Sequence, residues 1–446
     1  MDFAPSSEPL ALAARNVPRY TSYPTAPHFT AAVDAEVYGR WLQELPADAT
    51  ISLYIHVPFC PELCHYCGCT TRAVRRFDPV ERYAERLIDE IALLEGLRGR
   101  RLTRVHWGGG TPSMLGPLWL PTVATRIAAL FDLSALEEHA IELDPRRLDP
   151  AIVRALAEIG ITRASLGVQD TSAHVQEAIG RIQPFELVER AAQWLREAGV
   201  ANLNIDLMYG LPRQTVDDVR RSAERAASLS PQRLALFGYA HVPWFKTHQR
   251  LIDEAALPDA AERLRQAQAA TETLVGFGYQ AICLDHFARP DDDLAVAART
   301  GRLRRNFQGY TTDNADALIG IGASAIGKLP QGYVQNARDT AGYSRAVAAG
   351  RLATVKGFAL SEDDRLRADI IERLMCDRTV DLAPYGGPAA FADARAALAP
   401  LAEQGLVVID RDAITVTEKG RPYARIAAAA FDAYLAAGAG RHSAAV

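Results

Sequence analysis

Short runs of apolar and β-branched residues recur along the chain, and longer amphipathic stretches separate them. The runs have the length and composition of buried strands, whereas the stretches between them repeat apolar residues at the helical spacing. We predict six strands, over residues 51–57, 103–107, 140–144, 163–168, 202–207 and 233–239. Two of the intervening helices are predicted over residues 79–97 and 215–229. Six strand–helix units in a row imply parallel strands joined by right-handed crossovers.

Polar residues help to choose between the two architectures that fit this alternation, an open doubly wound sheet and a closed or partly closed barrel. Glu142, Gln169, Asp206 and Tyr239 each stand at the carboxyl end of a predicted strand. A barrel gathers its chemistry at that rim from several strands, whereas an open sheet concentrates it near one switch point. The expected fold class is α/β, an incomplete (β/α)6 TIM-like barrel. A further run over residues 280–287 is a candidate extension of the sheet.

The sequence changes character on both sides of the predicted barrel, which we assign to residues 46–345. Residues 1–45 are rich in Pro, Ser and Tyr and show little periodicity, so we expect an extended arm. Residues 346–446 are Ala-rich and helical, apart from a β-hairpin expected over residues 405–420 with its turn at the sequence DRD. Helices followed by such a hairpin predict a small, mainly helical, winged-helix-like C-terminal domain.

Composition and charge are those of an ordinary globular protein, with 49% hydrophobic residues, 23% charged residues and a net charge of −5. The acidic balance argues against nucleic acid as a partner, and therefore against DNA binding by the C-terminal domain. We find neither a secretory signal nor an apolar window of about 18 residues, so we expect a cytoplasmic protein without a membrane partner. No segment marks an assembly face, so we expect a monomer. The isolated Cys283 and Cys376 are expected to be core thiols.

Four of the six cysteines lie within the ten residues CPELCHYCGC. Structural zinc normally takes two C-x2-C pairs separated by about a dozen residues, and no second pair follows here. Thiolates of Cys60, Cys64 and Cys67 can hold three irons of a four-iron four-sulfur cluster and leave the fourth iron open to a substrate or cofactor. Cys69 either ligates the fourth iron, which would make the protein an electron carrier, or lines the site as a free thiol.

Further candidate ligand-binding residues follow the other predicted strands. The second strand ends in HWGGGTPS (residues 106–113), whose glycines let the backbone approach a ligand closely, but the Gly-Lys-Ser/Thr ending of a phosphate-binding loop is absent. Glu142 at the barrel rim needs donors such as a sugar diol or an ammonium group. Gln169, Arg181 and Asp206 add a second polar set. Together these residues offer more binding capacity than one ligand molecule needs.

The cysteine loop after the first strand, followed by the Gly-Gly-Gly-Thr-Pro stretch, resembles the radical S-adenosylmethionine (SAM) enzymes. Over nearly the whole chain the sequence also resembles the oxygen-independent coproporphyrinogen III oxidases, also called coproporphyrinogen dehydrogenases, in the segments PRYTSYPTAPHF, SLYIHVPFCPELCHYCGC, LGVQD, NIDLMYGLP, DHFARPDDDLAVA and RNFQGYTT. The resemblance implies an oxidoreductase of haem biosynthesis that converts two propionates of coproporphyrinogen III to vinyl groups, giving protoporphyrinogen IX. A 5'-deoxyadenosyl radical would drive this decarboxylation without oxygen.

The resemblance also implies roles for individual residues. Cys60, Cys64 and Cys67 would bind the [4Fe-4S] cluster, and Tyr54 and Cys69 would be catalytic. A first SAM molecule would contact Tyr54, Gly109, Glu142 and Ile326. A second SAM molecule would contact Tyr66, Gly110, Thr111, Gln169, Arg181, Asp206 and Ala240. An electron donor to the cluster and an electron acceptor are also required, and the sequence identifies neither.

The implied substrate carries four carboxylates, and arginine can engage both oxygens of a carboxylate. We therefore hypothesise that Arg19, Arg289 and Arg305 hold propionates, and that Tyr20 and Tyr23 let the arm fold over the opening of the site. The alternative function is that of a haem chaperone from the same superfamily. Those relatives lack both the PRYTSYPTA arm and the cysteine two residues after the cluster triad, so the enzyme is favoured.

Overall fold

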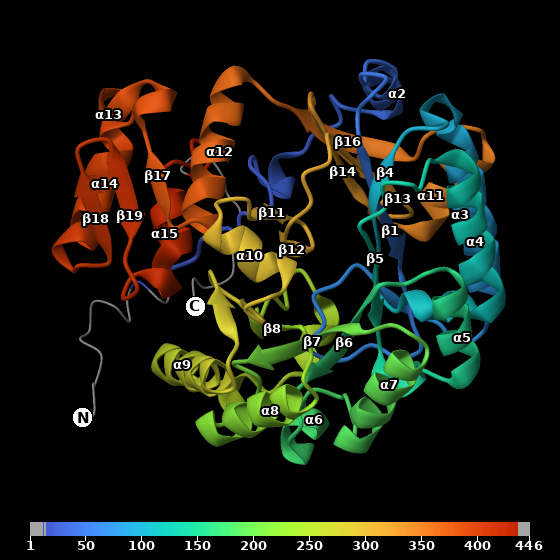
Figure 1. The fold of residues 1–446 in the computed structure, drawn as a ribbon, viewed down its shortest axis with the longest axis horizontal. Helices are drawn as coiled ribbons and strands as arrows, with labels where there is room; N and C mark the ends of the chain where they lie inside the picture. Colours follow the sequence, from blue (N-terminus) through green and yellow to red (C-terminus); the bar gives the residue numbers. More distant parts are fainter. Residues whose placement is uncertain (1–11, 13–14, 436–446) are drawn as a thin grey trace.

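The centre of the molecule is a curved twelve-stranded sheet, seen in a computed structural model that describes residue 12 and residues 15–435 (Figure 1). Its strand order is β16-β15-β14-β13-β1-β4-β5-β6-β7-β8-β10-β9. Among the described residues, the edge strands β16 (Thr354–Ala359) and β9 (Gln280–Ile282) do not pair with each other. The barrel is therefore incomplete, as the sequence predicts.

The six predicted strands are present and run parallel through the middle of this sheet, as β1 (Ile51–Val57), β4 (Leu102–Gly109), β5 (Glu138–Leu143), β6 (Arg163–Gln169), β7 (Asn202–Tyr209) and β8 (Arg233–Gly238). Helices cover the outer side of the sheet (Figure 1): α3 (Asp78–Leu93), α4 (Gly116–Leu130), α5 (Pro150–Glu158), α6 (Ala173–Ala178), α7 (Phe185–Glu197), α8 (Val216–Ser228) and α9 (Ala260–Gly276). Their apolar faces form one continuous core with the strands. Because β1 is covered on both faces, its sequence ISLYIHV is almost uniformly buried.

Additional strands widen the barrel at both edges. Beside β1 lie the parallel strand β13 (Ala317–Ile321) and then the antiparallel strands β14 (Ile326–Leu329), β15 (Gly332–Asn336) and β16. The run over 280–287 does extend the other edge, but as two antiparallel strands, β9 and β10 (His286–Ala288). Outside this sheet are the hairpin β11 (Arg304–Asn306) and β12 (Gly309–Thr311), and the helices α10 (Asp293–Arg299) and α11 (Thr340–Ala348).

The N-terminal region differs from the extended arm predicted over residues 1–45. It contains the helix α2 (Ala35–Gln43), whose first turn is capped by the side chain of Asp34. Tyr20 and Tyr23 are buried in the core of the C-terminal domain, and both also line a second cavity together with Ser52 of the barrel. That they let the arm fold over the opening of the site stays a prediction. The Tyr20 hydroxyl donates a hydrogen bond of 3.0 Å to Asp432. The arm is therefore anchored to the other end of the chain.

The C-terminal domain has its own hydrophobic core, built by α12 (Glu362–Cys376), α14 (Ala392–Glu403), α15 (Ala424–Ala429) and the strands β17 (Thr379–Asp381), β18 (Val407–Asp410) and β19 (Ala413–Val416). The short helix α13 (Gly387–Ala390) buries no side chain. The hairpin of β18 and β19 turns at DRD, as predicted. The barrel sheet continues past residue 345 to Ala359, because β16 pairs with β15. The division into an arm, a barrel and a C-terminal domain stays a prediction, but the barrel sheet ends at Ala359 and not at residue 345. No helix in the described ranges combines the length and apolarity needed to span a membrane.

Candidate active site

The glycine run at the end of β4 packs against the side chains of β1. A Cβ atom on Gly108 would lie 3.0 Å from the Tyr54 ring, and one on Gly109, which has a φ of 111°, would lie 2.5 Å from the His56 ring. The Tyr54 hydroxyl hydrogen-bonds to Nδ1 of His56 at 3.0 Å. Only glycine allows this close approach, so the run brings two aromatic side chains and free backbone to one surface.

The thiol loop starts beside these residues. Cys60 ends the short strand β2 (Phe59–Cys60), which pairs with β3 (Arg72–Ala73). The Thr71 hydroxyl donates a hydrogen bond of 3.3 Å to Sγ of Cys60, and the Thr111 hydroxyl lies 3.5 Å from the same sulfur. Thr111 of HWGGGTPS therefore contacts Cys60, the first predicted cluster ligand.

Two guanidinium groups contact the second predicted ligand. Arg146 and Arg181 each direct an N–H group at Sγ of Cys64, at 3.7 and 3.6 Å. Both arginines also pair with Asp144, at 2.7 and 3.2 Å, which fixes their position. Asp144 and Arg146 were not among the residues predicted from the sequence, although they follow β5 directly and thus lie at the rim. Charged hydrogen-bond donors of this kind suit a sulfur atom that ligates a metal.

The third predicted ligand, Cys67, is held by the loop after β8. Nε2 of His248 donates to the Cys67 carbonyl oxygen at 2.7 Å, and the Lys246 ammonium group donates to the Cys69 carbonyl oxygen at 2.8 Å. A hydrogen bond with the Cys69 side chain is the main cause that lowers the pKa of Cys67 to about 6. Cys67 is therefore prepared as a thiolate, with the exposed Cys69 as its neighbour.

These donors fit an iron–sulfur cluster. Each iron of such a cluster is held by one thiolate, and hydrogen bonds to the sulfurs tune it. Within the described part of the chain, no three His, Cys, Asp or Glu side chains gather closely enough to hold a single metal ion. The neighbours described above lie at different sulfurs: hydroxyl groups at Cys60, guanidinium groups at Cys64 and the Cys69 thiol at Cys67.

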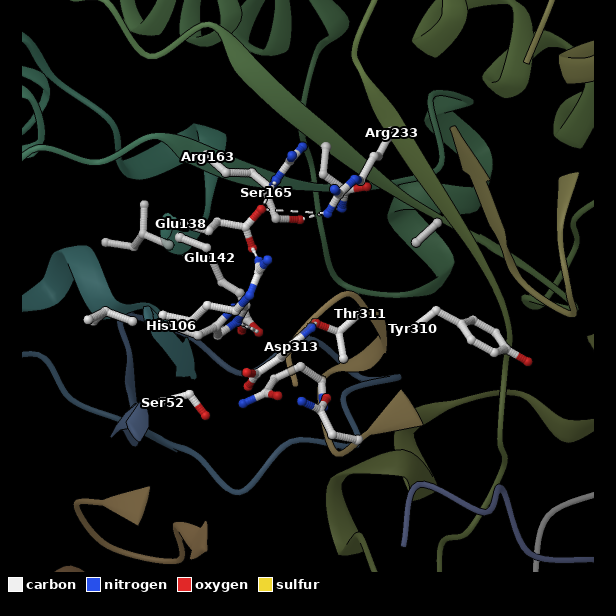
Figure 2. Close-up of a pocket in the computed structure, with 18 of the residues that line it drawn as sticks. Ser52, His106, Glu138, Glu142, Arg163, Ser165, Arg233, Tyr310, Thr311 and Asp313 are labelled. Atoms are coloured by element: carbon white, nitrogen blue, oxygen red, sulfur yellow. Dashed lines mark hydrogen bonds and ion pairs between the residues drawn. The ribbon is translucent and has the colours of Figure 1, made fainter. Parts of the chain in front are cut away.

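Inside the barrel, Glu142 of β5 lies beside His106 of β4 (Figure 2). Its carboxylate accepts hydrogen bonds from the Gly109 amide at 3.2 Å and interacts with Nε2 of His106 at 3.1 Å. Burial raises the pKa of Glu142, but these two groups outweigh it, and the net direction is downward. Glu142 is therefore an anion next to the backbone that the glycines leave open.

Asp206 of β7 faces the same cavity, but its pKa is shifted upward, whereas that of Glu142 is shifted downward. It accepts hydrogen bonds from Ser165 at 2.7 Å and Asn204 at 2.8 Å, but burial, with Glu142 nearby, raises its pKa to about 6. Gln169 adopts a left-handed φ of 71° at an irregularity between β6 and β7. This rim therefore has one carboxyl group that is firmly ionised and one that titrates near neutral pH.

The cavity of about 180 Å³ is also lined by charged side chains near the amino ends of the strands, among them Glu138, Arg163 and Arg233 (Figure 2). There Glu138 pairs with Arg163 at 2.6 Å, Arg104 at 3.4 Å and Arg233 at 3.7 Å. Burial raises the pKa of Glu138, but the three arginines together lower it to about 2. This network of Glu138 and three arginines was not predicted from the sequence. It lies at the end of the barrel opposite the thiol loop.

The remaining predicted cofactor residues also lie near the carboxyl end of the barrel. Gly320 pairs with Tyr54 and approaches Ile326 so closely that a Cβ on Gly320 would lie 2.9 Å from the Ile326 carbonyl. The side-chain amide of Gln249 donates to the carbonyl oxygens of Tyr66 at 2.8 Å and Ala240 at 3.3 Å. The structure thus brings Ile326 to the first predicted set, and joins Tyr66 and Ala240 through Gln249.

The three candidate substrate arginines occupy different places. Arg19 reaches the carboxyl end of β8, where it donates a hydrogen bond of 3.1 Å to the Gly238 carbonyl. Arg305 stacks on Tyr310 at 4.3 Å and donates to the Arg19 carbonyl at 3.4 Å, so it supports the arm from a buried position. Arg289 is exposed after Ala288, which pairs with the first residue of β8. The hypothesis is wrong for Arg289, because the antiparallel β10 carries it to the amino end of the barrel.

Comparisons with known proteins agree with this geometry. Family models for the radical SAM superfamily and the HemN C-terminal domain match residues 54–226 and 360–423. The chain is 50% identical over 437 residues to the oxygen-independent coproporphyrinogen III oxidase of Bradyrhizobium diazoefficiens, covering 96% of this chain and 97% of that one. The corresponding Escherichia coli protein is 39% identical over 425 residues, covering 94% and 93%. A solved structure of E. coli coproporphyrinogen III oxidase (HemN), described as a radical SAM enzyme, matches with a TM-score of 0.89 at 37% identity, covering 94% of this chain and all of that one.

The fold and the thiol loop thus define an oxidoreductase of the radical SAM superfamily, which implies a [4Fe-4S] cluster and SAM as cofactors. Within that class, the chain belongs to the family of oxygen-independent coproporphyrinogen III oxidases.

Proposed function

We propose that this protein converts coproporphyrinogen III to protoporphyrinogen IX in haem biosynthesis, turning two propionate side chains into vinyl groups without oxygen. The observation that carries the proposal is its similarity, at 50% identity over 96% of the chain, to a curated relative named for this oxidase activity. The supported thiol loop and the polar barrel rim are the features that this chemistry needs.

Each group of rim residues has a task in this reaction. When bound, the cluster and SAM supply a 5'-deoxyadenosyl radical that removes a hydrogen atom from the substrate propionate. Cys60, Cys64 and Cys67 hold the cluster. Glu142 and the open backbone at Gly109 bind polar groups of SAM, because an ionised carboxylate attracts its ammonium group and accepts hydrogen bonds from its ribose. The protein otherwise orients the reactants and excludes competing groups.

A second SAM molecule is part of the proposal, because each of the two propionates needs its own radical. Asp206 and Gln169 offer polar groups beyond the Glu142 side of the rim, and Gln249 holds Tyr66 and Ala240 together. Gly110, Thr111 and Arg181 complete this set. Thr111 and Arg181 also contact cluster ligands, so the second position lies beside the thiol loop.

The position of Arg19 supports a role in binding a substrate carboxylate. Its side chain is accessible at the carboxyl end of β8, whereas Arg305 is committed to Tyr310 and to the Arg19 carbonyl. We therefore assign propionate binding to Arg19, and to Arg305 the positioning of the arm.

The protein would work as a cytoplasmic monomer, with an electron donor for the cluster and a separate electron acceptor.

Anaerobic reconstitution tests the function directly. The purified protein is loaded with iron and sulfide, then given dithionite, SAM and coproporphyrinogen III, and the products are identified by mass. We expect a porphyrinogen that has lost two carboxyl groups, and two 5'-deoxyadenosines for each molecule formed. Tight haem binding without loss of carboxyl groups would overturn the proposal in favour of a haem chaperone.

A further inference from the structure

The cluster ligand Cys60 lies one strand away from the molecular surface. In the ladder of β2 and β3, Cys60 pairs with Ala73 and Phe59 pairs with Arg72. Both residues of β3 are exposed, and the preceding Thr71 donates its hydroxyl hydrogen to Sγ of Cys60 at 3.3 Å. Hydrogen bonds therefore join an exposed strand directly to a sulfur that binds the cluster. An electron arriving at β3 has a short path to the iron.

The surface around β3 has an exposed apolar centre. Phe77 is 47% exposed and Leu118 is 67% exposed. The Phe77 ring lies against the start of α4, because a Cβ atom on Gly116 would lie 3.7 Å from it, and Leu118 follows on the same helix two residues later. Exposed apolar side chains on segments beside a functional group are typical of a protein interaction site.

Arginines border this apolar centre. Arg72, Arg75 and Arg76 are all exposed, and the Arg76 side chain is 81% exposed. Asp78 pairs with Arg76 at 2.7 Å, which leaves an excess of positive charge in a chain whose net charge is −5. We call these three arginines with Phe77 and Leu118 the β3 patch. A basic patch on an acidic protein selects and steers an acidic partner.

We propose that the β3 patch is the docking site of the electron donor, a small acidic carrier protein with a flavin or iron–sulfur group. The carrier loses one electron to the cluster, and no bond forms or breaks at the patch. Phe77 and Leu118 provide the apolar contact, and the arginines orient the carrier so that its redox group faces Cys60. The inference rests on the proposed function only in that the protein must hold a reducible cluster.

The test compares two routes of cluster reduction in the Arg75→Glu/Arg76→Glu variant. Both arginines are exposed, and Arg76 pairs with Asp78 and not with a cysteine of the thiol loop. Stopped-flow absorbance follows reduction of the reconstituted cluster by a reduced bacterial flavodoxin, and separately by a photoreduced deazaflavin, a small uncharged molecule. A matched control, Arg154→Glu/Arg351→Glu, makes the same charge change at exposed positions on α5 and after α11.

We expect reduction by flavodoxin to slow at least tenfold at low salt and to lose most of its salt dependence in the β3 variant, with the deazaflavin rate unchanged. The control pair should stay near the wild-type rate. A wild-type flavodoxin rate in the β3 variant, or an equal loss in the control, would overturn the proposal. If the charge reversal lowers the iron content, the variant Arg75→Gln/Arg76→Gln is used instead. Reduction of its cluster by flavodoxin at the wild-type rate would also overturn the proposal. Because the readout is cluster reduction, failure here differs from failure to convert coproporphyrinogen III.

Discussion

Single residues of the thiol loop differ in what surrounds their sulfur atoms. Cys60 meets two hydroxyl groups, Cys64 meets two guanidinium groups, and Cys69 is exposed beside Cys67. Hydrogen-bond donors around a sulfur stabilise its thiolate, which is the form that binds iron. The sulfur atom of Cys64 therefore has two charged donors beside it, whereas the thiol of Cys69 interacts with that of Cys67.

This difference predicts opposite results for two serine variants. Cys64→Ser should reduce the iron content of the reconstituted protein several-fold, because a weak hydroxyl ligand replaces the thiolate. Cys69→Ser should keep the iron content of the wild type but lose at least tenfold in coproporphyrinogen conversion. Iron analysis, absorbance near the visible band of the cluster and product formation measure both effects.

Cys283→Ser is the control for the cysteine variants, since Cys283 donates to the carbonyl of Cys376 at 2.8 Å, away from the thiol loop. It should preserve both iron and activity. Loss of iron in Cys69→Ser would instead make Cys69 a cluster ligand and contradict the assignment.

At the scale of elements, one buried carboxyl group ties α3 to the strands beside β1. Glu90 of α3 accepts hydrogen bonds, each of 2.7 Å, from the Gly322 amide, the Asn336 side chain and the Tyr343 hydroxyl. Gly322 precedes β14, which starts at Ile326. This network therefore fixes the loop that carries Ile326 towards Tyr54.

Glu90 should make the stability of the protein depend on pH. Burial raises the pKa of Glu90 from its usual value of 4.5 to about 7, even though its three donors oppose the change. As the pH rises between these values, the unfolded chain releases a proton that the folded protein keeps, so the free energy of unfolding falls. The loss is at most ~3 kcal/mol, because one pKa unit corresponds to about 1.4 kcal/mol.

Denaturant unfolding of wild type and Glu90→Gln between pH 5 and pH 7.5 measures this effect. The stability of the wild type relative to the variant should fall with rising pH and level off above pH 7. Comparing slopes removes the constant cost of the altered hydrogen bonds. A relative stability that stays flat or rises with pH would show that Glu90 is ionised in the folded protein throughout this range.

At the scale of the whole molecule, the arm links the C-terminal domain to the barrel rim. Tyr20 and Tyr23 are buried in the C-terminal core, and the neighbouring Arg19 reaches Gly238 at the end of β8. Arg305 supports the same segment through the Arg19 carbonyl. The C-terminal domain thus helps to set the position of the arginine that we assign to the substrate.

Arg19→Ala should raise the KM for coproporphyrinogen III about tenfold or more, because a charged hydrogen bond to a carboxylate contributes roughly 1.5–3 kcal/mol. SAM cleavage in the absence of porphyrinogen should keep its wild-type rate. Arg289→Ala is the matched control, since Arg289 is exposed at the other end of the barrel, and both parameters should be unchanged. Equal KM values for the two variants would reject the role of Arg19.

The local features of this protein can be predicted from its amino-acid sequence alone. The six parallel strands follow from apolar runs, and the DRD hairpin follows from a turn between two short strands, because periodicity and turn chemistry act over a few neighbouring residues. The spacing of Cys60, Cys64 and Cys67 indicates the cluster, because the three predicted ligands lie within eight residues of one loop. Glu142 and Asp206 were found because the carboxyl ends of parallel strands share one rim.

Only the tertiary structure decided which distant residues meet. Nothing local distinguishes Arg19, at the rim, from Arg289, at the opposite end, because the direction of β10 depends on pairing with β8. Likewise, Arg146 contacts Cys64, and Tyr20 is buried with the C-terminal helices, through contacts between segments far apart in sequence. Such contacts depend on how whole elements pack, and local patterns of polarity carry little information about them.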